Sequence, residues 1–205
     1  MAKNFAEIGF SAAAKKLQEK HGSRKTYSRM ESQTVYSGLG RHEQSFIAQR
    51  DSFYMATSGE NGFPYIQHRG GPKGFLKVLD ENRLGFIDFK GNMQYISVGN
   101  IATNNKVSLF MVDYPNKRRL KLYAKAEIVE LKDNTELLQN LDLEDYKFQP
   151  ERMMVFNIEA FDWNCPQHIT TRFTVEEVEE ALKPQYEHIK NLEAEITVLK
   201  AKLGL

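Results

Sequence analysis

The chain has 205 residues, 41% of them hydrophobic and 11% aromatic, which is enough for one substantial core with helical additions. The formal net charge of +1 argues against nucleic-acid binding, because neutralising many phosphates takes a strongly basic face. The single cysteine, Cys165, excludes an internal disulfide framework and a cysteine-only zinc site.

The first residues lack the apolar core of a secretory signal, and no apolar run is long enough to cross a bilayer. We therefore expect a cytoplasmic protein with no membrane partner. The five histidines are scattered without ligand spacing, so no metal site is expected.

Residues 1–45 are predicted to form an N-terminal helical extension. Phe5, Ile8 and Leu17 share one stripe of a helix over residues 5–21, with Gly22 as its stop. Residues 24–40 are polar and aperiodic and are expected to lack regular structure. A second helix over residues 42–49 then leads into the first strand.

Residues 46–173 carry the signals of a β domain. Strands are predicted at 52–57, 65–69, 74–79 and 84–89, and their close succession indicates an antiparallel meander. A loop and short helix at 91–102, a strand at 106–112, a strict alternation from Leu120 to Ile128, a helix at 135–141 and a strand at 153–158 follow. Six or seven short strands at this spacing predict a small antiparallel barrel.

Residues 174–205 form a C-terminal helix with an apolar stripe. Its members fall on alternating three- and four-residue steps, interrupted once by Gln185: Leu182, Ile189, Leu192, Ile196, Leu199 and Leu203. Pro184 suits a first turn better than a helix interior, so a break is expected there. The stripe pairs two subunits or docks on its own barrel, and both interpretations stay open.

Basic residues and glycines are interleaved with the strands between residues 64 and 127. Guanidinium and ammonium groups are the preferred donors to a phosphate, and glycine lets the backbone approach a ligand. The candidate donors and glycines are Arg69, Lys73, Lys77, Arg119, Lys121, Gly70, Gly71 and Gly74. A solvated strand face with a loop is the alternative interpretation of the same pattern.

Several motifs in order make a more specific signal. They are Gln67-His68-Arg69-Gly70-Gly71-Pro72, Asp88-Phe89-Lys90-Gly91-Asn92, Ser97-Val98-Gly99-Asn100-Ile101 and Trp163-Asn164-Cys165-Pro166-Gln167-His168-Ile169. The chain resembles, over roughly residues 42–173, the pyridoxamine 5′-phosphate oxidase-related family of FMN-binding split barrels. The resemblance implies a mainly β fold, a six- to seven-stranded antiparallel split barrel with N-terminal helices and a C-terminal helix. It also implies a homodimer with FMN at the interface.

The resemblance places cofactor-binding residues along the barrel. Arg69 and Lys77 match the two ends of the family's phosphate-binding strand, and Trp163 and Arg172 resemble residues that reach the flavin from the other subunit. The full set implied is Arg69, Gly70, Lys73, Lys77, Ile87, Asp88, Asn92, Gln94, Arg119, Trp163, Gln167, His168 and Arg172.

One segment departs from the family's pattern. Asn92-Met93-Gln94 stands where the oxidases show a Ser-Arg-Lys run, so two positive charges are missing beside the phosphate. Either Lys73, Arg119 or nearby backbone compensates, or FMN binds more weakly. The pattern that reads pyridoxal phosphate is also not evident, so an activity other than vitamin B6 oxidation is expected.

The sequence thus favours an FMN-dependent oxidoreductase acting on a small redox substrate. Cys165 and His168 form either a reactive thiol–imidazole pair or a contact beside the flavin, and no catalytic residue is assigned. The alternative is a non-catalytic carrier or sensor that binds flavin, haem or deazaflavin.

Overall fold

The computed structural model describes residues 4–33 and 37–204 of the chain. These fall into two compact units. The first contains the chain up to Asp113 together with Arg118–Pro166, and the second contains Tyr114–Lys117 and the chain from Gln167 onward. The first unit holds all seven strands, and the second holds the C-terminal helix.

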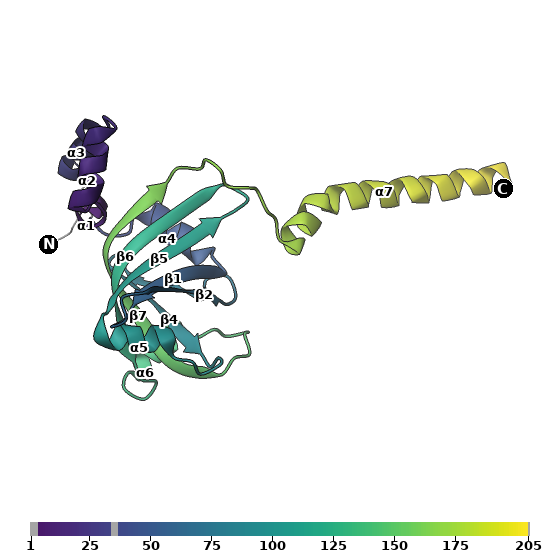
Figure 1. Ribbon diagram of the computed structural model, residues 1–205. Coiled ribbons are helices and arrows are strands. Elements are labelled where there is room, and N and C mark those ends of the chain that lie inside the picture. Colours follow the sequence, from purple (N-terminus) through teal and green to yellow (C-terminus); the bar gives the residue numbers. More distant parts are fainter. Residues whose placement is uncertain (1–3, 34–36, 205) are drawn as a thin grey trace. The chain divides into compact units, whose positions relative to one another are not determined.

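The first unit is built on one open, antiparallel, seven-stranded sheet (Figure 1). Its strands are β1 (Ser52–Ser58), β2 (Pro64–Gly70), β3 (Lys77–Asp80), β4 (Arg83–Phe89), β5 (Lys106–Asp113), β6 (Arg118–Val129) and β7 (Pro150–Asn164). Their order across the sheet is β2-β1-β5-β6-β7-β4-β3. The expected split-barrel class is confirmed.

The predicted meander of the first four strands is wrong. β1 pairs with β2 and β3 pairs with β4, but the two hairpins lie at opposite ends of the sheet. The strands β5, β6 and β7 separate them. Local strand signals cannot predict this, because the choice of neighbour depends on long-range pairing. The strand observed in place of the predicted 74–79 is β3, which begins only at Lys77. Phe75 and Leu76 lie before it, outside the strand, and are buried.

The sheet encloses a core that the alternation from Leu120 predicts correctly. Leu120, Leu122 and their β5 neighbour Leu109 are fully buried, and Leu109 lies opposite Leu122 in the register. Aromatic rings fill the centre: Phe53 meets Phe86 edge-on with ring centroids 5.5 Å apart, and Phe86 stacks on Phe156 at 5.9 Å. Such pairs add specific geometry to burial.

Strand β4 is buried on both of its faces. Ile87 packs with Leu141 and Met153 in a second apolar cluster, on the side of the sheet where α6 (Thr135–Leu141) lies. The sequence of β4 therefore reads as a continuous apolar run, with Asp88 as its one buried acid. The helix predicted at 135–141 is confirmed.

Helices at the N-terminus differ from the prediction. The expected helix over residues 5–21 is interrupted, giving α1 (Phe5–Gly9) and α2 (Ala12–Lys20), because Ser11 caps α2 by accepting a hydrogen bond from the Ala14 amide at 3.2 Å. α1 packs on the sheet through Phe5, whose ring stacks on Tyr123 of β6 with centroids 4.6 Å apart.

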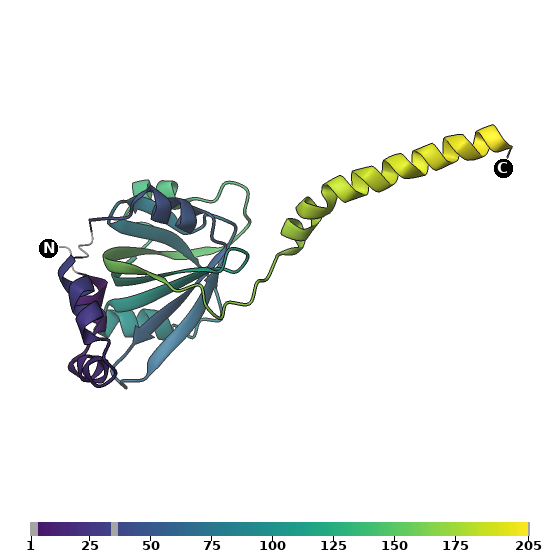
Figure 2. The same cartoon turned by 90° about the horizontal axis from the view of Figure 1, so that it is seen from above.

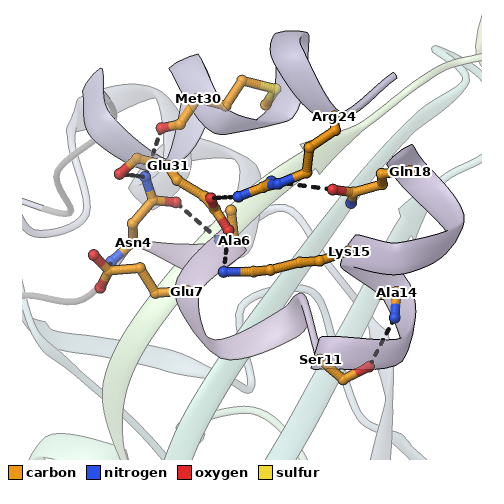
Figure 3. A network of polar contacts seen from close by, with 10 residues as sticks. All are labelled: Asn4, Ala6, Glu7, Ser11, Ala14, Lys15, Gln18, Arg24, Met30 and Glu31. Atoms are coloured by element: carbon orange, nitrogen blue, oxygen red, sulfur yellow. Dashed lines mark hydrogen bonds and ion pairs between the residues drawn. The ribbon is translucent and has the colours of Figure 1, made fainter. Parts of the chain in front are cut away.

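The stretch predicted to be irregular begins with a helix, α3 (Arg24–Gln33); residues 34–36 lie outside the described part of the chain. Tertiary polar contacts hold α3 (Figure 3). Glu31 pairs with Lys15 of α2 at 2.8 Å and with Arg24, while Asn4 donates to the carbonyls of Met30 and Glu31 at 2.7 and 3.0 Å. Lys15 and Asn4 come from outside α3, so the local periodicity of this segment does not reveal these contacts.

Two further helices cover the sheet of the first unit. α4 (Arg41–Ala48) matches the predicted second helix and buries Phe46 and Ile47 in the core. α5 (Ile96–Thr103) follows β4 and is tied to β1 by a hydrogen bond from Asn100 to Thr57 at 3.0 Å.

The second unit consists mainly of α7 (Val175–Leu203), a single helix of 29 residues (Figure 2). The break predicted at Pro184 is wrong, because the helix continues through it. Thr174 caps its start in a capping box with Glu177, and Gly204 ends it in the left-handed conformation.

Candidate functional site

A cleft opens between strands β2 and β4, the start of β7, and the segment that leads into α5. It encloses about 400 Å³ of space, part of it open to solvent. Polar and aromatic side chains dominate its walls. The lining residues are Tyr65, Gln67, Arg69, Asp88, Phe89, Gly91, Asn92, Met93, Gln94, Tyr95, Ile96, Ser97, Val98, Glu151 and Arg152.

Two arginines that line this cleft form ion pairs with one buried carboxylate. Asp88 is 4% exposed and pairs with Arg69, and its other oxygen accepts from Arg152 at 3.2 Å. Arg152 also pairs with Glu151 at 2.8 Å. We call Arg69, Asp88 and Arg152 the charge triad.

The charge triad exists because the sheet curls. Asp88 and Arg152 are neighbours in the register of β4 and β7, so their contact follows from strand pairing. Arg69, however, lies on edge strand β2, at the opposite end of the strand order from the β4–β3 hairpin. An ion pair between Arg69 and Asp88 therefore joins both ends of the open sheet across the barrel.

Burial governs the protonation of the charge triad. It raises the pKa of the Asp88 carboxyl, and the positive charges of Arg69 and Arg152 oppose this shift without reversing it. It also lowers the pKa of the Arg69 guanidinium, with Asp88 opposing the shift. The Asp88 carboxyl and the Arg69 guanidinium are thus largely shielded from water where they line the cleft.

Arg69 has a buried hydrogen-bond donor that no acceptor among the described residues uses. Its guanidinium carries five N–H donors, and one nitrogen serves Asp88. Its Nε atom is buried and has no hydrogen-bond partner within the described ranges. A buried donor left without an acceptor is costly, so Arg69 has an unmet demand for an acceptor at the wall of the cleft.

The segment before α5 has an unusual backbone. Met93 and Tyr95 adopt left-handed conformations, with φ of 59° and 53°, although neither is glycine. Such conformations persist only where surrounding contacts hold them. Tyr95 donates to Glu151 at 2.7 Å, and this hydrogen bond raises the pKa of the Tyr95 hydroxyl, so that it remains a donor. Nearby, Ser97 of α5 donates to Gln67 of β2 at 2.7 Å.

The N-terminal end of α5 opens on the cleft, where Ile96, Ser97 and Val98 line the wall. The amide groups of a first helical turn have no carbonyl partner within their own helix. Together with the helix dipole they favour an anion. The charge triad and the start of α5 thus face the same space.

Four of the predicted site residues line this cleft: Arg69, Asp88, Asn92 and Gln94. Ile87 is 2% exposed and packs in the second apolar cluster. Gly70 ends β2, and Lys73 is exposed in the loop that follows. Neither of these two lines the cleft.

Lys77 lies in a different hollow. It lines a shallow depression together with Arg41, Gln44 and Ser45 of α4. Lys77 and Arg69, which the resemblance placed on one phosphate, thus line different hollows, and a shared role for them stays a prediction.

Arg119 and Trp163 lie on neighbouring strands away from the cleft walls. Arg119 donates to the carbonyl of Cys165 at 2.6 Å. Trp163 donates to Glu43 of α4 at 2.8 Å and meets the Phe46 ring edge-on, with centroids 4.8 Å apart. Arg118 lies over the Trp163 ring at 4.8 Å.

Gln167, His168 and Arg172 belong to the second unit. His168 is exposed with a left-handed φ of 62°, and Gln167 beside it is exposed as well. The Arg172 guanidinium lies over the Tyr114 ring at 5.0 Å within the same unit.

Sequence reasoning missed the cleft residues of β7. The last strand was predicted to begin at 153, whereas β7 begins at Pro150 and carries Glu151 and Arg152. A signal was present: an acid within the apolar run of β4 needs a buried cationic partner. Tyr65 and Tyr95 were also missed, and no pattern in the sequence distinguishes them from ordinary surface tyrosines.

The described residues contain neither a cluster of metal ligands nor a helix that could span a membrane. In residues 4–33 and 37–204, no three His, Cys, Asp or Glu side chains converge to hold a metal ion. Over the same residues, no helix combines the length and apolar character needed to span a bilayer.

Comparison with known proteins gives a family match over the barrel. The family model described as pyridoxamine 5′-phosphate oxidase matches residues 39–163. No curated protein sequence matches the chain.

Solved structures share the fold at low sequence identity. HupZ of Group A Streptococcus is 15% identical with a TM-score of 0.50, covering 66% of this chain and 100% of that one. A variant of the same streptococcal protein is 16% identical with the same TM-score, covering 62% and 99%. An FMN-binding protein of Syntrophomonas wolfei is 14% identical with a TM-score of 0.47, covering 72% and 97%. The two streptococcal structures support the architecture of the barrel.

Proposed function

Because the chain belongs to the pyridoxamine 5′-phosphate oxidase family, we propose that its cleft binds FMN and that the protein is an FMN-dependent oxidoreductase. The observation that carries this proposal is the buried Arg69 guanidinium, whose Nε donor has no partner among the described residues and which lines the cleft beside the start of α5. An anionic phosphate would supply an acceptor for the Arg69 guanidinium and would lie at the start of α5, which favours an anion.

The residues present fit a phosphate group. Arg69 and Arg152 supply forked guanidinium donors, the first turn of α5 supplies backbone amides, and Asn92 and Gln94 supply side-chain amides. A β-carbon at Gly91 would meet no atom within 4 Å, so the loop leaves room there. Arg152, which pairs with Asp88 and Glu151, brings a second guanidinium to the cleft, where Asn92-Met93-Gln94 lacks two positive charges.

Bound FMN would supply hydride or electron transfer, and the chain would hold and shield it. Tyr65, Phe89 and Tyr95 provide aromatic surface along the cleft. Both cleft carboxylates are engaged, Asp88 by two arginines and Glu151 by Arg152 and Tyr95. The chain's own groups in the cleft therefore bind and orient, and chemistry is left to the cofactor.

A second copy of the chain would complete the site. β2 lines the cleft with alternate residues and exposes the others, and Ile66 is 64% exposed. Phe63 just before β2 is 76% exposed, and Tyr54 of β1 is 40% exposed. Exposed apolar residues beside a cleft favour an interface. We propose that a homodimer forms here, with Trp163, Gln167, His168 and Arg172 as candidates to contact the flavin of the other subunit.

The engaged carboxylates also fit a second candidate, a carrier or sensor that holds a flavin, a deazaflavin or haem without turnover. One experiment separates the two. The visible spectrum of freshly purified protein, with mass identification of the released cofactor, names the ligand. Anaerobic reduction by NADH or NADPH, followed by reoxidation, supports an enzyme, whereas tightly bound but inert flavin supports the carrier.

The substrate is tested on the same preparation. Pyridoxamine 5′-phosphate is included among candidate reductants, and we expect it not to reduce the flavin. A protein that stays colourless and fails to bind added FMN would overturn the proposal.

A further inference from the structure

Helix α7 presents an apolar stripe with a heptad repeat. Taking Val175 as position a, apolar residues occupy every a position (Val175, Leu182, Ile189, Ile196 and Leu203) and every d position except Gln185 (Val178, Leu192 and Leu199). The exposed fraction of these side chains is 37% at its lowest, at Leu182, and 73% at Leu203. The described helix has no buried side chain.

We propose that α7 pairs with α7 of a second copy of this chain as a parallel, in-register, two-stranded coiled coil. A repeat of apolar a and d positions over about four heptads is the pattern that this association requires. The helix would be about 44 Å long at 1.5 Å per residue, enough to pair along its full length. The proposal does not depend on flavin binding.

Charged side chains flank the stripe in complementary positions. In a parallel pair, the residue at g of one helix lies beside e of the next heptad in the other helix. Glu195 then faces Lys200 of the second copy, and His188 faces Glu193 of the second copy. Both contacts occur twice by symmetry, and neither sets like charges together.

Gln185 selects the orientation. At a d position it meets Gln185 of the second copy in a parallel pair, where the two side-chain amides can bond to each other. In the antiparallel registers with the greatest overlap, it would instead face Ile189 or Ile196 of the second copy. Charge pairing alone does not decide between the parallel and antiparallel orientations, because one of these antiparallel registers also places opposite charges together, Glu179 beside Lys200. A polar residue at one core position is the best-attested device for setting register.

Pro184 is compatible with this pairing. It falls at position c, on the outer side of the helix, so its ring and its missing amide donor face away from the partner helix. The apolar stripe continues on both sides of it.

Cysteine cross-linking tests orientation and register in the full chain. The exposed Cys165 is first replaced by serine. Val178→Cys and Leu199→Cys then place thiols at d near the two ends of α7, and Glu180→Cys and Ala201→Cys place matched controls at the outward f positions. Because paired helices hold the two thiols at an effective concentration on the order of millimolar, we expect the d variants to form disulfide dimers at least about tenfold faster than the controls.

Three outcomes of the cross-linking would contradict the proposed pairing. Equal, slow cross-linking at d and f positions would overturn the pairing, including the case in which α7 docks on its own barrel. An antiparallel disulfide, from Val178→Cys to Leu203→Cys or to Ile196→Cys in the corresponding double variants, found by peptide mass mapping, would overturn the parallel orientation. Gln185→Leu should allow this antiparallel product to appear, and strict parallel selectivity in that variant would refute the role of Gln185.

Discussion

Replacing Arg69 by lysine tests the phosphate site directly. Arg69→Lys keeps one positive charge beside Asp88 but removes the Nε donor that has no partner among the described residues. Losing one hydrogen bond to a charged group costs about 1.5–3 kcal/mol. At 1.4 kcal/mol per factor of ten, the dissociation constant for FMN should rise about 10- to 150-fold.

The assay compares FMN with riboflavin. Flavin is removed reversibly, and the apoprotein is titrated with each ligand while the quenching of flavin fluorescence is followed. Riboflavin lacks the phosphate, so its affinity should change little in Arg69→Lys. The matched control is Arg83→Lys, whose side chain is 53% exposed and pairs with Asp80 at the surface. Equal losses for FMN and riboflavin, or no loss for FMN, would refute the placement of the phosphate at Arg69.

Three further predictions concern stability. Asp88→Asn should lower the free energy of unfolding by about 3–5 kcal/mol, since it leaves the buried Arg69 guanidinium without its carboxylate and Arg152 with Glu151 alone. Added FMN should then raise the melting temperature more than in the wild type. Burial alone would raise the pKa of Glu43, but hydrogen bonds from Trp163 and His42 outweigh burial and lower that pKa. The stability lost in Glu43→Gln should therefore be greatest above pH 4.5. This loss should vanish as the pH falls through the lowered pKa. Leu122→Ala should cost about 2–5 kcal/mol in urea unfolding, because Leu122 is fully buried.

Each of these has its own control. Trp163 is the single tryptophan, so its fluorescence reports unfolding at each pH for the wild type, Glu43→Gln and the exposed variant Glu60→Gln. A constant difference between the wild type and Glu43→Gln from pH 7 to pH 3 would contradict the linkage. Leu17→Ala, at a side chain 57% exposed, should change stability by no more than about 0.5 kcal/mol. An FMN shift in Asp88→Asn no larger than in the wild type would argue against a phosphate beside the two arginines.

Local patterns were sufficient for most elements of the barrel. The alternation from Leu120 to Ile128 predicts β6, and the helix at 135–141 has the observed bounds. The heptad stripe of α7 was also readable, because helical periodicity is a property of the segment itself. Only the placement of Pro184 misled, since the rest of the helix is strong enough to continue through it.

Part of the candidate site came from the family resemblance and not from local periodicity. Arg69, Asp88, Asn92 and Gln94 belong to the set that the resemblance implied, and all four line the cleft. The resemblance grouped Lys77 with Arg69 on one phosphate-binding strand, whereas in the structure Lys77 begins β3 and lines a different hollow, beside α4.

Only the tertiary structure decided which distant residues meet. The order β2-β1-β5-β6-β7-β4-β3 separates two hairpins that are consecutive in the chain, and the curl of the sheet then returns Arg69 to Asp88. Arg152 joins them through the register of β7 against β4. Side-chain period and turn chemistry are local and can be read from the chain, whereas strand partners and closure depend on the packing of the whole core.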